Sequence, residues 1–191
     1  MLEQPADPAW NGDERTTVSG FLEEQRSTLA WKCQGLSDAQ LKEPSVPPSK
    51  LTLLGLVRHM AEVERSWFRR RLQGEPIGRI WGTDAQPLAD FNEVAGADVA
   101  EAFAAWAEEC RIARSILTNV ESLDVTFSTP AYPKMSARCM VNHMIEEYSR
   151  HNGHADLIRE RIDGKTGDFP SPEERTSRPG PGSVAPGTRV P

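Results

Sequence analysis

Hydrophobic residues recur at intervals of three and four along four stretches of the chain, and polar or proline-containing segments separate these stretches. This spacing places apolar side chains on one face of an α-helix. It predicts four helices, which run from Thr16 or Thr17 to about Gln34, from Leu51 to Gln73, from Ala97 to about Val120 and from Ser136 to Gly164. Four such helices, with at most a short extended segment between them, predict an all-α protein built as a four-helix bundle.

The segments outside these helices are marked by proline, glycine and small polar residues. Residues 1–13 are expected to form a flexible lead, residues 14–166 the bundle, and residues 167–191, which are rich in proline and glycine, a disordered tail. A single short turn is predicted at Asp38 to Leu41, and a long loop from Gly74 to Gly96. Loops of this length in compact domains are often functional, so this loop is expected to cover a pocket.

The composition and net charge of the chain argue against two classes of binding partner. The formal net charge of −6 and the pI near 5.3 argue against a surface for nucleic acid or anionic membranes. No apolar run approaches the roughly 20 residues of a membrane span, and the N-terminal residues lack the features of a signal peptide, so we expect a cytoplasmic location. The three cysteines, Cys33, Cys110 and Cys139, have no CxxC spacing and are expected to be reduced and mostly buried.

Four potential metal ligands share one stripe of the last predicted helix. His143, Glu147, His151 and His154 fall within roughly 80° of one another on a helical wheel, and methionine and isoleucine flank them. The stripe is therefore predicted to face the core. Burying unpaired polar groups costs roughly 1–3 kcal/mol each, so such a row needs partners. A bound metal ion or a hydrogen-bond network without metal would each supply them.

A third ligand is available from the second predicted helix, where His59 lies at the edge of the apolar face. Glu147 and His151 are one turn apart, and facing helices of a bundle can pool such side chains around an ion. Two imidazoles and a carboxylate leave coordination positions open, which is typical of catalytic sites. Zinc is the first expectation, and nickel, iron, cobalt or manganese would also suit the site. Glu62 and Glu64 are either surface charges or orient the His59 imidazole.

Several neighbouring residues allow a structural and a functional interpretation. Cys139 lies one turn before His143 and is either a small buried residue or part of a Cys–His nucleophile. His143 itself is expected to support the ligands or to pack in the core. Arg69, Arg70 and Arg71 either complement the dipole at the end of their helix or bind an anionic thiol or a substrate carboxylate.

Three blocks of the sequence resemble the DinB/YfiT-like superfamily of metal-binding four-helix bundles. They are FLEEQRSTLAWK at Phe21 to Lys32, LTLLGLVRHMAEVERSWFRR at Leu51 to Arg70, and the segment His143 to Gly164, which contains HMIEEYSRHNGHAD. The similarity covers most of the chain. The combination of blocks is specific, whereas any one block alone would be a weak signal.

The resemblance implies a metal triad of His59, Glu147 and His151, in the ExxxH form of the mycothiol-dependent maleylpyruvate isomerase-like members. His154 stands where relatives often carry glutamine, so it is expected to support the ligands, to act as a fourth ligand or to handle the proton. A triad of His59, His151 and His154 is the alternative. Arg70 and Trp67 are the candidates for contacting the thiol cofactor, although Trp67 also suits a core or pocket wall.

The resemblance also implies an activity. Characterised members of the superfamily use a low-molecular-weight thiol such as mycothiol or bacillithiol, and a coordinating thiol loses its proton beside a divalent cation. The chain lacks the second domain of the isomerase members, so the expected function is metal-dependent transfer of the thiol to a small electrophile. The alternatives are a non-catalytic binding module for stress responses and a metal-dependent hydrolase. The bundle is also expected to be able to form a homodimer.

Overall fold

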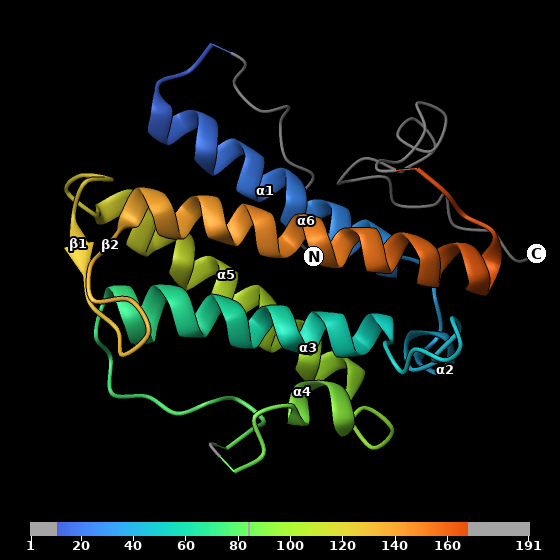
Figure 1. The fold of residues 1–191 in the computed structure, drawn as a ribbon. Helices are drawn as coiled ribbons and strands as arrows, with labels where there is room; N and C mark the ends of the chain where they lie inside the picture. The colour runs from blue at the N-terminus through green and yellow to red at the C-terminus, as the bar shows by residue number, and fades with distance from the viewer. Residues whose placement is uncertain (1–10, 84, 168–191) are drawn as a thin grey trace, which may run out of the picture.

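The structure of this 191-residue chain is a computed structural model that describes residues 11–83 and 85–167. Within these ranges, four long helical segments lie side by side as a bundle (Figure 1). They are α1 (Glu14–Cys33), α3 (Leu53–Glu64) with its continuation η1 (Arg65–Leu72), α5 (Val99–Asn119) and α6 (Ala137–Asp163). The all-α bundle predicted from the sequence is therefore confirmed. Residues 1–10 of the expected lead and 168–191 of the expected tail lie outside the described residues.

The long helices begin and end within three residues of the bounds that hydrophobic spacing predicts. Asp13 caps α1 by accepting a hydrogen bond from the backbone N–H of Thr16, so neither threonine is the cap that the sequence suggested. Gly164 ends α6 in the left-handed conformation, with φ of 77°, as a C-terminal glycine should. The second helix differs from the prediction because its last eight residues, Arg65–Leu72, wind as a π-helix.

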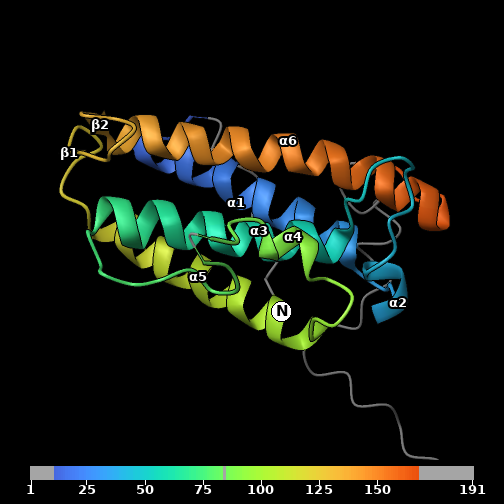
Figure 2. The same ribbon diagram turned by 60° about the horizontal axis from the view of Figure 1, so that its bottom comes forward.

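The direction of the helices explains the long connection in the middle of the chain. α1 and α6 run one way and α3 and α5 run the other (Figures 1 and 2). Arg138 and Glu14 pair at the starts of α6 and α1, and Arg159 near the end of α6 donates to the carbonyl of Lys32 near the end of α1. Because α3 and α5 are parallel neighbours, residues 73–98 must return the chain along the bundle before α5 can begin.

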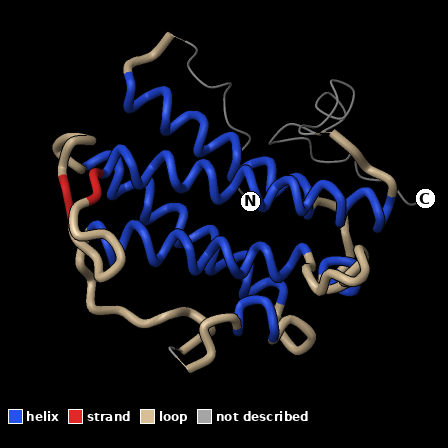
Figure 3. Tube along the Cα trace, viewed as in Figure 1, coloured by secondary structure: helices blue, strands red, loops and turns tan. Residues whose placement is uncertain are grey.

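Short elements complete the fold. The turn predicted after α1 is the helix α2 (Asp38–Leu41), and the crossover contains a second short helix, α4 (Ala89–Asn92), which was not predicted. Strands β1 (Thr126–Phe127) and β2 (Met135–Ser136) form an antiparallel pair at the end of the bundle where α5 ends and α6 begins (Figure 3).

A buried polar network ties the four long helices together. Glu64 on α3 accepts hydrogen bonds from Arg26 Nε on α1 at 2.8 Å and from the Tyr148 hydroxyl on α6 at 2.8 Å. The same hydroxyl accepts a hydrogen bond from Trp106 Nε1 on α5 at 2.8 Å. All four side chains are at most 2% exposed, and burial raises the pKa of the Tyr148 phenol, which therefore stays protonated as a donor. Glu64 is thus neither a surface charge nor a partner of His59.

The cysteines are free thiols, but only two fit the expectation of burial. Cys33 and Cys110 are buried, and burial raises the pKa of the Cys33 thiol to about 12. Cys139 is exposed on the first turn of α6, which corrects its interpretation as a small buried residue. No helix in residues 11–83 and 85–167 has both the length and the apolar character required to cross a membrane.

Candidate metal centre

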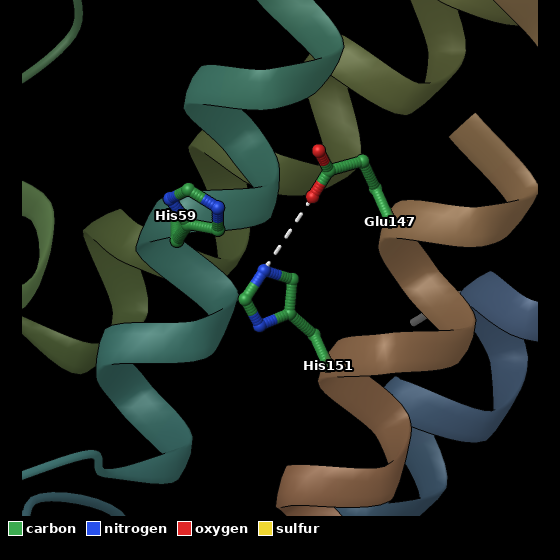
Figure 4. A group of neighbouring side chains, drawn as sticks. All are labelled: His59, Glu147 and His151. Atoms are coloured by element: carbon green, nitrogen blue, oxygen red, sulfur yellow. Dashed lines mark ion pairs between the residues drawn. The ribbon is translucent and has the colours of Figure 1, made fainter. Parts of the chain in front are cut away.

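Three side chains from two helices that are distant in sequence converge at the middle of the bundle. His59 projects from α3, and Glu147 and His151 project from adjacent turns of α6 toward it (Figure 4). One ligand atom from each side chain lies within 4.8 Å of the others, and all three residues are half-buried. Among the described residues, no other group of His, Cys, Asp or Glu meets this geometry. The predicted triad is therefore brought together.

Asp90 fixes the orientation of the His59 ring. Its Oδ2 atom lies 2.8 Å from His59 Nδ1, and Asp90 is only 4% exposed. The ring also stacks on Phe91 with a centroid separation of 4.6 Å. A carboxylate at this distance favours a proton on Nδ1, which leaves the lone pair of Nε2 available to an ion. Asp90 therefore orients the His59 imidazole, a role for which the sequence had offered Glu62 and Glu64 as candidates.

The crossover carries Asp90 and is bound to α3 at several points. Arg58 donates from Nε to the backbone carbonyl of Asp90 at 3.0 Å. Glu62 accepts hydrogen bonds from the backbone N–H groups of Ile80 and Trp81 at 2.8 and 3.0 Å. Gly55 permits close packing, since a Cβ atom there would lie 3.3 Å from the ring of Phe91. The long loop therefore contributes a residue that contacts the candidate site, while its expected role as the cover of a pocket stays a prediction.

His151 is held in a state that suits metal binding. Burial, and then the neighbouring imidazoles of His59 and His154, lower its pKa from 6.5 to about 4. Its Nε2 atom lies 3.6 Å from Glu147 Oε2, and its Nδ1 atom lies 3.4 Å from His154 Nδ1. A proton on His151 Nδ1, donated to His154, would leave Nε2 unprotonated and directed toward Glu147. The ring is therefore neutral at neutral pH and able to donate a lone pair.

His154 lies behind His151 rather than beside the other two ligands. It contacts Nδ1 of His151, on the opposite side of that ring from Glu147. The group that meets the metal geometry contains Glu147 and not His154. Of the two triads considered from the sequence, the arrangement favours His59, Glu147 and His151, with His154 as a neighbour of the site.

The remaining histidine of α6, His143, lies beside Glu147. His143 Nε2 lies 3.3 Å from Glu147 Oε1, while Glu147 Oε2 faces His151. The edge of His143 packs on Trp67 with ring centroids 4.8 Å apart. The two oxygens of Glu147 are thus approached by different imidazoles. The polar stripe predicted to face the core is half-buried, and it lies where α6 meets α3.

The other candidates from the sequence lie near this centre without touching the three ligands. Trp67 is 7% exposed and reaches the site through His143. Arg70, on η1, is half-buried and makes no hydrogen bond or ion pair within the described part of the chain. Cys139 makes no side-chain contact with His143 that would indicate a Cys–His pair.

Asp90 is the residue that sequence reasoning missed. It stands in a stretch with no long hydrophobic period, and nothing in its immediate sequence distinguishes it from other loop carboxylates. The available signal was the length of the crossover, which indicated function without indicating which residue provides it.

The fold and the side chains at the site are those of a four-helix bundle with a candidate metal centre. Two imidazoles and a carboxylate between antiparallel helices form a donor set that suits a divalent cation and leaves coordination positions free. The chemistry of these side chains therefore fits the metal that the bundle was expected to hold.

Comparison with known proteins places the chain within a family. Residues 17–164 match the profile of the mycothiol S-transferase family, and the chain belongs to this family. The DinB-like resemblance and the thiol-transferase kind of activity inferred from the sequence are thereby confirmed. Such an activity involves a small-molecule thiol and an electrophile. Searches of curated proteins and of solved structures returned no match.

Proposed function

We propose that this protein is a metal-dependent mycothiol S-transferase whose metal is held by His59, Glu147 and His151. The observation that carries the proposal is the convergence of three ligand atoms within 4.8 Å in a member of this family. Zinc is the first candidate, because neutral imidazole and carboxylate ligands with open positions are typical of its catalytic sites. Nickel, iron, cobalt or manganese would suit the same donors.

A divalent cation held by His59, Glu147 and His151 would supply the positive charge that favours loss of the proton from a coordinating thiol at neutral pH. The residues of the chain prepare the site for that chemistry. Asp90 holds His59, and His143 approaches the Glu147 oxygen that faces away from His151. Burial keeps His151 neutral, so protons do not compete for its lone pair near pH 7.

The proposed reaction joins the thiol sulfur to an electrophilic carbon. The sulfur–carbon bond forms as the leaving group departs with its electron pair, or as the electron pair of a conjugated double bond moves to a neighbouring atom. His154 is proposed to accept the proton released by the thiol, since it is half-buried beside His151. Trp67 and Arg70 are proposed to contact the thiol, because Trp67 borders the site through His143 and Arg70 makes no ion pair of its own in the described chain.

Metal-dependent conjugation tests this proposal. The purified protein is stripped of metal, reloaded with one equivalent of zinc, and incubated with mycothiol and monobromobimane, and the conjugate is quantified by mass spectrometry. The loaded protein should accelerate conjugation, whereas stripped protein should give the uncatalysed rate. His59→Ala and His151→Ala should also give the uncatalysed rate and should retain no zinc. Asp38→Asn, at an exposed position on α2, should behave as the wild type. Equal zinc content in wild type and both histidine variants would refute the metal assignment.

The same experiment separates the alternatives. A non-catalytic binding module would retain zinc through the three ligands but would accelerate no conjugation with mycothiol, bacillithiol or cysteine. A hydrolase would turn over ester or amide substrates without any thiol. We also propose that the bundle forms a homodimer and works in the cytoplasm; both remain predictions, which light scattering and cell fractionation can test.

A further inference from the structure

The π-helical segment η1 carries a positive charge that the described part of the chain does not neutralise. Arg65 and Arg69 both pair with Glu109, and Arg69 also pairs with Glu75. Arg70 and Arg71 have no carboxylate within ion-pair distance among residues 11–83 and 85–167. The positive charge of these two adjacent arginines is therefore available to a bound anion.

Arg71 is fixed in place rather than extended into solvent. Its guanidinium lies over the Trp67 ring, 4.4 Å from the centroid, and it donates a hydrogen bond from Nη1 to Ser66 Oγ. Burial lowers its pKa, and the positive charges of Arg70 and Arg79 lower it further. The Arg71 guanidinium is therefore held in place, half-buried and near other positive charges, and its remaining N–H groups are available as donors. A bound anion would relieve this repulsion.

This guanidinium lies close to the candidate metal centre. Trp67 packs against His143 with centroids 4.8 Å apart, and His143 lies 3.3 Å from Glu147. Two side chains therefore separate Arg71 from a proposed metal ligand. Tyr132, from the loop between β1 and β2, has its ring centroid 6.2 Å from that of Trp67. The rings of Trp67 and His143 thus form a chain of contacts from the Arg71 guanidinium to the candidate metal centre.

The segment that holds this arrangement is the π-helix η1. Trp67 and Arg71 are four residues apart within η1; the Arg71 guanidinium packs on the Trp67 ring, and the same ring contacts His143. π-Helical turns are rare and often occur at functional sites. A guanidinium supported by an aromatic face presents a planar pair of N–H donors, which matches the two oxygens of a carboxylate.

We propose that Arg71, supported by Trp67, binds a carboxylate on the electrophilic substrate. The inference rests on the proposed S-transfer function and specifies the class of substrate, namely small electrophiles that carry a carboxylate some bonds away from the reacting carbon. In the reaction the carboxylate is unchanged. The sulfur–carbon bond forms at the reacting carbon, the bond to the leaving group breaks, and the leaving group takes the electron pair.

Paired substrates test the proposal by turnover. Zinc-loaded protein and mycothiol are given ω-bromoalkanoates, from bromoacetate to bromohexanoate, and the corresponding neutral amides, and each rate is corrected for the spontaneous reaction. The acid should be preferred over its amide at one or more chain lengths. In Arg71→Gln the acid-to-amide ratio of kcat/KM should fall by about tenfold or more, as expected for the loss of one charged hydrogen-bonded pair. Arg71→Lys should recover part of the preference.

The matched control is Arg111→Gln, because Arg111 is exposed on α5 and, within residues 11–83 and 85–167, pairs only with Glu108 of the same helix. This variant should keep the wild-type ratio. Circular dichroism of each variant checks that the bundle is intact. No preference for the acid at any chain length, or an equal preference in wild type and Arg71→Gln, would overturn the carboxylate site.

A binding measurement keeps the test independent of catalysis. Fluorine NMR of trifluorobutanoate and trifluorobutanamide, recorded on full-length protein with and without zinc, reports binding by line broadening. Trifluorobutanoate should broaden more than the amide in both metal states, and Arg71→Gln should remove the difference. Broadening that depends on zinc but not on Arg71 would place the anion on the metal and refute the proposal. If monobromobimane, the bromoalkanoates and the amides all fail to be turned over, the S-transfer function fails, and NMR alone decides the anion site.

Discussion

Replacement of Asp90 by asparagine tests whether the crossover helps to build the metal centre. Asp90 Oδ2 lies 2.8 Å from His59 Nδ1, and the residue is 4% exposed, so this contact is screened from solvent. Asparagine has the same shape and keeps an oxygen that can accept a hydrogen bond from the Nδ1–H group of His59. The substitution therefore removes the negative charge while it leaves the packing of α4 unchanged.

The expected loss follows from the strength of a charge-assisted hydrogen bond. Such bonds contribute about 1.5–3 kcal/mol, and 1.4 kcal/mol corresponds to a tenfold change in an equilibrium constant. Residues that orient a metal-binding histidine typically change metal affinity by about 10- to 100-fold when mutated. Because asparagine retains an acceptor, we expect Asp90→Asn to weaken zinc binding by about tenfold. Asp90→Ala, which removes the acceptor as well as the charge, should weaken zinc binding by close to about 100-fold, the upper end of this range.

Zinc affinity is measured by competition with a chromophoric chelator, and nitrogen-detected NMR of the imidazoles reports the tautomer of His59. Both should change in Asp90→Asn, and the tautomer should become mixed because the neutral amide holds the Nδ1 proton less firmly. The control Asp38→Asn makes the same chemical change on the exposed helix α2 and should leave both unchanged. Wild-type affinity together with a wild-type tautomer in Asp90→Asn would show that the contact has no role in the site.

Two further predictions concern the buried polar groups. Tyr148→Phe removes a hydroxyl that donates to Glu64 and accepts from Trp106, so the free energy of unfolding in urea should fall by about 1–3 kcal/mol, whereas Tyr132→Phe, at an exposed residue, should change it little. Since burial lowers the pKa of His151 from 6.5 to about 4, the unfolded state binds more protons between these values, and metal-free protein should lose stability as the pH falls through this window. His151→Gln should show a smaller loss between pH 7 and pH 4; an equal loss would mean that His151 is not buried in its neutral form.

The fold was predictable because each long helix has a clear apolar period and a recognisable end. The interval of three and four in Val99–Asn119 leaves only one face that can be buried, and Gly164 stops the last helix at the position where the sequence suggests. The π-helical winding of Arg65–Leu72 was not predicted, because the hydrophobic spacing was interpreted with the period of an α-helix throughout, and π-helices are rare.

The metal candidates were found for a different reason. Glu147 and His151 are one turn apart on a single helix, so their proximity follows from helical geometry alone. His59 required two helices to meet at a particular height, which spacing cannot determine and the family resemblance supplied. Hydrophobic spacing also could not show which way Glu62 and Glu64 point, so their predicted roles as surface charges or partners of His59 were wrong. Their distance from His59 in sequence is short, but the helix directs one toward the crossover and the other into the core.

The direction of the helices links these observations to the site. Because α3 and α5 are parallel, the chain must pass back along the outside of α3, and this path brings α4 against His59. A bundle in which consecutive helices alternated in direction would need only a short turn there, and His59 would have no carboxylate behind it. The crossover is therefore a consequence of topology that also contributes the support for one ligand. This reasoning explains why the supporting residue lies in the least regular part of the described chain, where periodicity carries no information.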